Sequence, residues 1–145
     1  ILVGDGDLKE KIIEKINSLK LNENVLLLGT RKDIAELLIA SDIFLLPSLF
    51  EGLPFTLIEA QATGIKCVVS DMVPIDAKIL DNYEIVSLES TPSNFAKFII
   101  KDEFYDRNFA AEIVKQKGYD IIEAAKNLED YYLSLYKRSN FNENR

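Results

Sequence analysis

Two glutamates in one short stretch, Glu51 and Glu59, carry the most chemical information in this sequence. Pro54 lies between them and suits the first position of a helix, because proline lacks the amide hydrogen that would be left unpaired there. Glu51 then precedes the helix and Glu59 lies inside it. Carboxylates accept charge-assisted hydrogen bonds from sugar and ribose hydroxyls. A bound ligand could therefore meet one carboxylate at each end of its length.

The start of this helix is also a candidate anion site. Gly52 allows the backbone to approach a ligand closely. The first amides of a helix have no partner within it and point toward an anion at the N-terminus. Here these amides belong to Phe55, Thr56 and Leu57. A diphosphate held between the two carboxylates is the ligand that this arrangement predicts.

Two further loops follow apolar, strand-like runs: Gly4-Asp5-Gly6 and Gly29-Thr30-Arg31-Lys32. In an open parallel sheet, ligands bind beyond the carboxyl ends of the strands. We therefore expect both loops to lie near the loop 48–53. Taken alone the glycines are a weak signal, because any turn from strand to helix favours glycine. Arg31 and Lys32 are also typical of a solvated charged pair.

The elements that must position these loops follow from the periodicity of apolar residues. Short β-branched runs alternate with segments of helical period, which indicates a parallel sheet wrapped by helices. We predict strands at 1–3 (buried), 24–28, 43–46, 66–70 and 84–88. We predict a helix capped by Asp7 with Leu8, Ile12, Ile13, Ile16 and Leu19 inward, helices near 34–38, 54–63 and 75–80, and one after Pro92.

The last part of the chain is predicted to be helical. Asp120 and Glu123 form a candidate capping box. The apolar face of this helix consists of Ile121, Ile122, Ala125, Leu128, Tyr132 and Leu135. Residues 139–145 are polar and lack a period, so a frayed, disordered tail is expected there.

Composition limits the class of protein. The chain has 145 residues, is 48% hydrophobic, and lacks a long uncharged apolar run, which predicts one soluble globular domain over 1–138. A net charge of -7 argues against nucleic acid and against an anionic membrane as partners of this segment. Because the first residues already read as a strand entering a glycine turn, we expect the chain to be a fragment of a longer protein.

Cysteine and histidine usage excludes several kinds of site. The sequence has no histidine and one cysteine, Cys67, so a histidine-based triad and a zinc site of histidine or thiolate ligands are excluded. Cys67 lies in an apolar run, which favours a buried structural thiol over a reactive one. A reducing, cytosolic setting fits this usage.

The stretch 51–60 resembles the E-x7-E motif of the retaining family-4 glycosyltransferases, which have the GT-B fold. Neighbouring motifs agree in order and spacing: Val-Gly-Asp-Gly at 3–6, Val-Leu-Leu-Leu-Gly at 25–29, Ala-Ser-Asp-Ile-Phe-Leu-Leu-Pro-Ser at 40–48, and Gly64 before a strand. The resemblance covers about 1–137, is strongest over 25–71, and looks most like the bacterial exopolysaccharide and capsule branch. It implies a Rossmann-like, three-layer α/β/α domain with a parallel sheet, the C-terminal half of a GT-B enzyme.

The resemblance also implies roles for individual residues. Glu51 would contact donor-sugar hydroxyls as the catalytic-site carboxylate, and Glu59 would bind the ribose. Backbone of Gly52, Leu53, Pro54, Phe55, Thr56 and Leu57 would hold sugar and diphosphate, Gly29, Thr30 and Arg31 would lie along the nucleobase, and Gly4 and Gly6 would line the nucleotide cleft. The substrate would be a nucleoside-diphosphate sugar, such as a UDP-sugar, with no metal and no cofactor required.

Two parts of such an enzyme are not in this sequence. The family's phosphate-binding Arg and Lys lie N-terminal to the strand that matches 1–3, and the acceptor domain precedes them. We therefore expect a cytoplasmic, bacterial enzyme, peripheral at the membrane only through its other half, and an isolated fragment without activity.

Other interpretations remain open at this point. Glu51 could be an acid favoured near a helix N-terminus by the helix dipole, and Glu59 a solvated helix residue. The chain could be a Rossmann-like binding or scaffolding module without catalysis. It could also belong to another GT-B enzyme, such as a nucleotide-sugar epimerase, although those use additional acids and histidines that this chain lacks.

Overall fold

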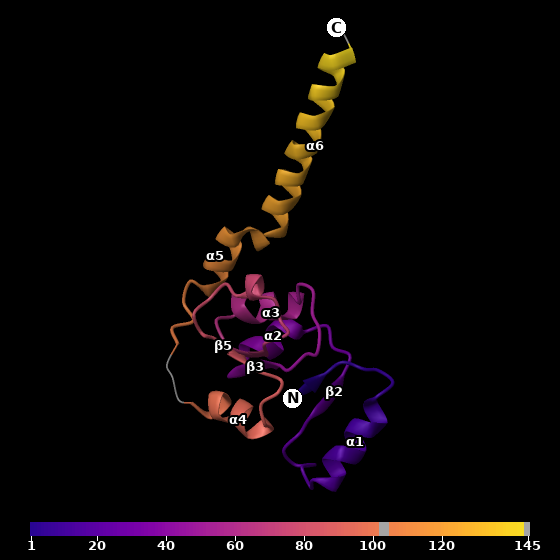
Figure 1. The fold of residues 1–145 in the computed structure, drawn as a ribbon, viewed down its shortest axis with the longest axis vertical. Helices are drawn as coiled ribbons and strands as arrows, with labels where there is room; N and C mark the ends of the chain where they lie inside the picture. The colour runs from indigo at the N-terminus through magenta and orange to yellow at the C-terminus, as the bar shows by residue number, and fades with distance from the viewer. Residues whose placement is uncertain (102–104, 144–145) are drawn as a thin grey trace. The chain divides into compact units, whose positions relative to one another are not determined.

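The computed structural model of the chain describes residues 1–101 and 105–143, with side chains described through residue 138. The sequence predicts one domain over 1–138. The structure forms two compact units, Ile1–Leu37 and Leu38–Arg145, and each is described by itself. Figure 1 draws both units as a ribbon and labels many of their helices and strands.

The first unit contains β1 (Leu2–Val3), α1 (Lys9–Ser18) and β2 (Leu27–Gly29). β1 and β2 pair in parallel, as predicted, with Leu2 opposite Leu27. The expectation of a buried strand at 1–3 is wrong, because Ile1 is 62% exposed and Leu2 is 47% exposed. A two-residue strand in a two-stranded sheet has too few neighbours to be covered.

α1 begins later than its sequence suggests. Leu8 is its N-cap and the helix makes no side-chain cap hydrogen bond, so the predicted cap by Asp7 is wrong. The reason is the preceding turn, in which the Lys9 amide donates to the Gly6 carbonyl at 3.0 Å. Of the apolar residues predicted to face inward, Ile16 is buried, whereas Leu8, Ile12 and Leu19 are exposed.

The second unit is built on a parallel sheet of β3 (Ile43–Leu46), β4 (Lys66–Ser70) and β5 (Tyr83–Val86) in the order β3-β4-β5. The predicted bounds of β3 and β4 are confirmed, while β5 is shorter than the predicted strand at 84–88. All five residues of the central strand β4 are buried. The carboxyl ends of the three strands therefore meet at one edge of a well-packed sheet.

Helices cover both faces of this sheet. α3 (Phe55–Ala62) contacts β3 and β4, and α4 (Pro92–Ile100) contacts β4 and β5. Figure 1 shows α3 and α4 on opposite sides of the strands. α2 (Ile34–Ile39) precedes β3. Parallel strands joined through helices confirm the predicted α/β fold class, although the hydrogen bonds form two sheets instead of one.

Between β4 and β5 the chain makes only a short 3-10 helix, η1 (Ile75–Ala77). A longer helix at 75–80 is predicted from the sequence. The amides of Ile79 and Leu80 instead donate to the Oε1 atom of Gln61, at 2.8 and 3.1 Å. These hydrogen bonds to a side chain of α3 take the backbone at residues 79 and 80 out of the helical conformation.

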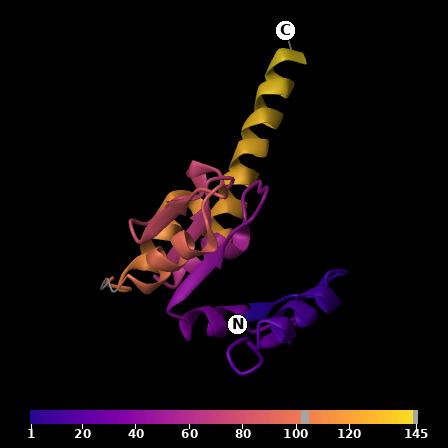
Figure 2. The same ribbon diagram turned by 60° about the horizontal axis from the view of Figure 1, so that its bottom comes forward.

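The C-terminal part is helical, as predicted, in α5 (Ala110–Val114), the π-helical η2 (Lys115–Tyr119) and α6 (Ile121–Glu143). The Oδ1 atom of Asp120 accepts hydrogen bonds from the amides of Ile122 and Glu123 at 3.0 and 3.1 Å, which confirms Asp120 as the cap. Figure 2 shows α6 as one uninterrupted helix. No helix among the described residues is long and apolar enough to cross a membrane.

Two expectations for α6 differ from the structure. Its predicted apolar face is exposed: Ile121 by 80%, Ile122 by 77%, Leu128 by 56%, Tyr132 by 62% and Leu135 by 40%. α6 makes contacts with η2, and this face stays exposed. The backbone also remains helical through Glu143 where a frayed tail is expected from 139, since neither glycine nor proline interrupts 139–143. Residues 144–145 lie outside the described residues.

The thiol of Cys67 is fully buried in β4, as predicted, and burial raises its pKa from 9.0 to about 12. At a pH between these two pKa values, the thiol is ionised in the unfolded chain but not in the folded one. The unfolded state then binds fewer protons, so the free energy of unfolding falls as pH rises.

We expect the ionisation of Cys67 in the unfolded chain to lower the free energy of unfolding by about 1 kcal/mol between pH 8 and pH 10. Urea unfolding of the unmodified protein and of Cys67→Ala at both pH values measures it. The variant should lose less stability over this interval than the unmodified protein. Equal losses in the two proteins would contradict the assignment.

Gly64 ends α3 in the left-handed region, with φ of 71°, and lies tightly packed. A Cβ atom here would lie 2.8 Å from Arg107 Cα and 2.9 Å from Arg107 Cβ. Arg107 is itself held in place, because its guanidinium donates to the carbonyls of Ile39 and Ser41.

Gly64→Ala is therefore expected to cost about 1–2 kcal/mol for backbone strain plus about 1–3 kcal/mol for overpacking. Gly118→Ala is the matched control, because Gly118 has φ of 93° and no atom within 4 Å of a built Cβ. Denaturant unfolding should show the larger loss for Gly64→Ala. Equal losses would mean that the contact with Arg107 relaxes freely.

Candidate functional site

The two glycine loops of the first unit lie together. The Gly4 amide donates to the Gly29 carbonyl at 2.9 Å, which joins the carboxyl ends of β1 and β2. Gly4 has φ of 133° and Gly29 has φ of 62°, values that residues with a side chain rarely adopt. The loops that contain these two glycines therefore meet at this edge. The same loops carry Gly6, Thr30 and Arg31.

Charged side chains in these loops are already paired. The guanidinium of Arg31 donates to both carboxylate oxygens of Asp33, from Nε at 2.8 Å and from an Nη atom. This pairing raises the pKa of Arg31 and lowers that of Asp33. Asp5 likewise accepts from Lys9 at 3.0 Å and from the Gly6 amide at 2.9 Å. Arg31 therefore has a partner within its own loop. This partner is the carboxylate of Asp33 and not the neighbouring side chain of Lys32.

In the second unit, the loop after β3 places Glu51 beside the sheet. Glu51 is half-buried, and its Oε1 atom accepts a hydrogen bond from Ser48 Oγ at 2.6 Å. The Ser48 carbonyl in turn accepts from Ser70 Oγ at 2.6 Å, and Ser70 is the last residue of β4. The carboxylate is therefore connected to the buried central strand through two hydroxyls.

α3 begins one residue later than predicted, with Pro54 as its N-cap. The Leu57 amide donates to the Pro54 carbonyl at 3.0 Å, so the expectation of a free amide at Leu57 is wrong. This hydrogen bond closes the first turn of the helix. The amides of Phe55 and Thr56 then remain as the donors at its N-terminus. Glu59 is exposed, one turn along the same face as Thr56.

Gln61 fixes α3 against the rest of the second unit. It is fully buried. Its Nε2 atom donates to the carbonyls of Leu57 at 3.3 Å and Ala77 at 2.8 Å, while its Oε1 atom accepts from two amides between η1 and β5. An apolar face of Leu57, Ile58 and Ala60 packs beside it. The position of Glu59 relative to the sheet therefore depends on Gln61.

Several large apolar side chains around Glu51 are exposed. Leu49 is 82% exposed, Phe50 86%, Leu53 41% and Phe55 69%. The loop backbone is anchored by Ser48 on one side and by the buried Pro54 on the other. The loop thus presents both a carboxylate and apolar surface at the carboxyl edge of the sheet.

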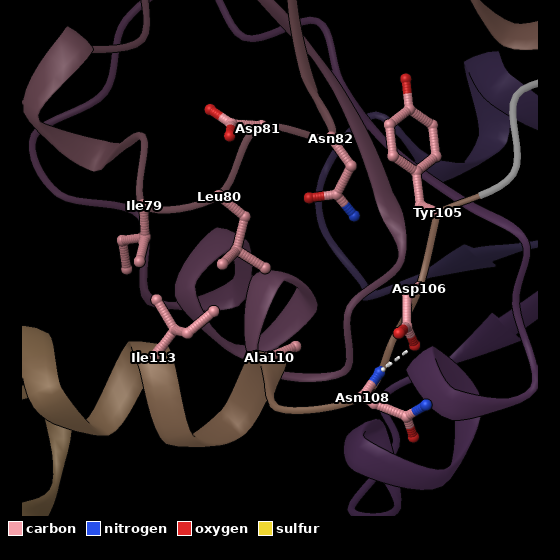
Figure 3. A pocket seen from close by; sticks show the side chains of 9 residues that line it. All are labelled: Ile79, Leu80, Asp81, Asn82, Tyr105, Asp106, Asn108, Ala110 and Ile113. Carbon is pink, nitrogen blue, oxygen red and sulfur yellow. Dashed lines mark hydrogen bonds between the residues drawn. The ribbon is translucent and has the colours of Figure 1, made fainter.

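A pocket of about 320 Å³ lies elsewhere in the second unit. It is lined by residues 79–82 and by residues between Tyr105 and Ile113, and Figure 3 shows Asp81, Asp106 and Asn108 around it. Residues 79–82 precede β5, whereas Ser48 and Glu51 follow β3. Because the strands are parallel, the pocket lies at the opposite edge of the sheet from Glu51. Open parallel sheets bind ligands at the carboxyl edge, which argues against this pocket as the main site.

Sequence reasoning did not single out Ser48, Ser70 or the packing role of Gln61. A hydroxyl three residues before Glu51 was the available signal for Ser48. Nothing in sequence order connects Ser70 to Ser48. Within the described residues, no group of three or more Asp, Glu or Cys side chains is placed to hold a metal ion.

Parallel sheets with helices and glycine turns at the carboxyl ends of the strands define a Rossmann-like α/β protein. Residues 1–103 match the family described as "Glycosyl transferases group 1". The chain belongs to this family.

Curated relatives carry related descriptions. Over 73 residues the chain is 47% identical to the putative glycosyltransferase EpsF of Bacillus subtilis (strain 168), covering 50% of this chain and 19% of that protein. Over 141 residues it is 29% identical to an Escherichia coli UDP-Gal:alpha-D-GlcNAc-diphosphoundecaprenol alpha-1,3-galactosyltransferase, covering 93% of this chain and 36% of that protein. The chain thus spans about a third or less of the length of these relatives.

A solved structure supports the fold. The apo form of the lipopolysaccharide outer core galactosyltransferase WaaB aligns with a TM-score of 0.69 at 23% identity, over 91% of this chain and 39% of that chain. At this identity the likeness establishes the fold alone. It agrees with the expected GT-B-type α/β domain.

Gln61→Leu keeps roughly the side-chain volume but removes the hydrogen bonds to the buried carbonyl of Ala77 and to the partly buried amides of Ile79 and Leu80. We expect the free energy of unfolding to fall by about 2–4 kcal/mol, since each unsatisfied buried group costs about 1–3 kcal/mol. Chemical denaturation gives this value.

Gln116→Leu is the matched control, because Gln116 is exposed and its amide donates to the exposed Glu112 carboxylate at 3.2 Å. A surface change of this kind should shift stability by about 0.5 kcal/mol or less. Similar values for the two variants would show that the contacts of Gln61 do not stabilise the fold.

Proposed function

We propose that this chain is the donor-binding domain of a retaining glycosyltransferase, which transfers a sugar from a nucleoside-diphosphate sugar to a glycan or lipid-linked acceptor in bacterial polysaccharide biosynthesis. The observation that carries the proposal is the pair of Glu51 and Glu59 around the N-terminus of α3, within the region that matches the family. UDP is the proposed nucleotide, supported by the name of the E. coli relative.

The start of α3 supports a phosphate site. The amides of Phe55 and Thr56 lead the helix, and helix N-termini favour negative charge. Gly52 supports a close backbone approach by the ligand. Its φ lies outside the left-handed range, and no atom lies within 4 Å of a built Cβ, so the fold alone gives no reason for glycine there.

In this proposal, the two carboxylates bind different parts of the donor. Glu51, oriented by Ser48, accepts hydrogen bonds from hydroxyls of the donor sugar. Glu59 lies four residues along α3 from Phe55, or about 6 Å of helix rise, which suits a ribose next to the diphosphate.

The proposed reaction needs groups beyond this chain. The leaving diphosphate requires cations, and the acceptor requires its own site. We propose that a preceding domain supplies both and that no metal is needed. The proposed place of action is the cytoplasmic side of the membrane, with any membrane contact made by that other domain.

Glu59→Ala is expected to weaken UDP binding about 10-fold, because a charge-assisted hydrogen bond to the ribose is lost. Glu51→Ala should leave UDP affinity within about 2-fold and instead reduce the additional affinity for a UDP-sugar. Isothermal titration with UDP and with UDP-galactose measures both effects.

Glu129→Ala is the control, because Glu129 is exposed on α6, away from the loop after β3 and the start of α3. Equal loss of UDP affinity from Glu51→Ala and Glu59→Ala would refute the division of roles. A folded, unmodified protein that does not respond to millimolar UDP would refute the donor site and favour an interaction module.

A further inference from the structure

The carboxylate of Glu51 has a dedicated hydrogen-bond donor within its own loop. Ser48 Oγ donates to Glu51 Oε1 at 2.6 Å, and both side chains are partly buried. A serine hydroxyl is a neutral hydrogen-bond donor. No hydrogen bond to Glu51 Oε2 is recorded among the described residues, which leaves this oxygen available to a ligand.

Ser48 is in turn fixed to the core. The Ser70 hydroxyl, fully buried at the end of β4, donates to the Ser48 carbonyl at 2.6 Å. β4 is the central strand and pairs with both β3 and β5, so Ser70 lies on a strand that is held on both sides. Ser70 thus positions Ser48, and Ser48 positions Glu51.

The surrounding loop offers little else to orient this carboxylate. Leu49 and Phe50 are more than 80% exposed, and Gly52 follows with no side chain. A long side chain in such a loop samples several rotamers unless a hydrogen bond selects one. Binding a sugar would then include the entropic cost of ordering the carboxylate, and a preformed hydrogen bond removes that cost.

We infer that Ser48 is a positioning residue that sets the specificity of donor-sugar binding by holding Glu51, and that Ser70 supports it. This inference rests on the proposed function, because it assigns the donor sugar to Glu51. The inference goes beyond the proposed function because it names two hydroxyls, those of Ser48 and Ser70, that do not contact the nucleotide. Their loss should affect recognition of the sugar and not of UDP.

The test uses the intact protein and compares Ser48→Ala with Ser48→Thr, which retains a hydroxyl. Titration calorimetry gives affinities for UDP and for UDP-galactose, UDP-glucose and UDP-N-acetylglucosamine, and the sugar that the unmodified protein prefers over UDP is used thereafter. Ser48→Ala should lose about 5-fold to 10-fold of affinity for that donor, the effect of one net hydrogen bond. Its affinity for UDP should stay within about 2-fold.

Three further proteins complete the test. Ser48→Thr should restore most of the donor affinity, and Ser70→Ala should show the same selective loss to a smaller extent. Ser134→Ala, which removes an exposed hydroxyl that donates to the Tyr131 carbonyl on α6, should change neither affinity. If Ser48→Ala does not fold, Ser48→Cys takes its place, with a weaker donor and an intermediate loss expected.

The outcomes separate the inference from the proposed function. If the unmodified protein binds none of these nucleotides, or binds no sugar donor better than UDP, the proposed sugar site fails and the inference fails with it. If it prefers a donor and Ser48→Ala keeps that preference, the inference alone is overturned. Equal losses for UDP and donor in Ser48→Ala, not restored by threonine, would show a merely structural role.

Discussion

The buried amide of Gln61 is the contact on which the candidate site of the second unit depends most. It satisfies two carbonyls and two amides from separate parts of the chain, and a buried polar side chain with fewer partners would be destabilising. By joining α3 to the segment before β5, it fixes the helix that carries Glu59. It also explains why the chain after η1 leaves the helical path that its own sequence favours.

A second constraint acts at the end of β4. Ser70 holds the loop after β3 through the Ser48 carbonyl, and the next residue, Asp71, accepts from the Leu88 amide after β5 at 3.0 Å. The hydrogen bond from Leu88, together with one from Ser87, lowers the pKa of Asp71. Two adjacent side chains at the end of the central strand, those of Ser70 and Asp71, thus connect the loops on either side. The carboxyl edge is an organised surface even though its outer residues are exposed.

Much of the second unit could be predicted from the sequence, because local signals there agree with packing. β3 and β4 are apolar runs bounded by Pro47 and Gly64, and the bounds follow from those residues. Predictions were poorer where local pattern and tertiary burial disagree. The apolar residues of 1–3, α1 and α6 have the spacing of buried faces, yet most are exposed, since spacing does not specify which surface covers a face.

Residue types and their short-range spacing predict the order of the elements, the family motif around Glu51 and Glu59, the glycine turns and the buried thiol of Cys67. These features depend on residue type and on neighbours within one or two turns of the chain. The tertiary structure was needed to show that the Gly4 amide donates to the Gly29 carbonyl and that Ser70 of the central strand donates to the Ser48 carbonyl. Such contacts join residues whose proximity depends on strand order and loop path, and local propensity carries no information about either.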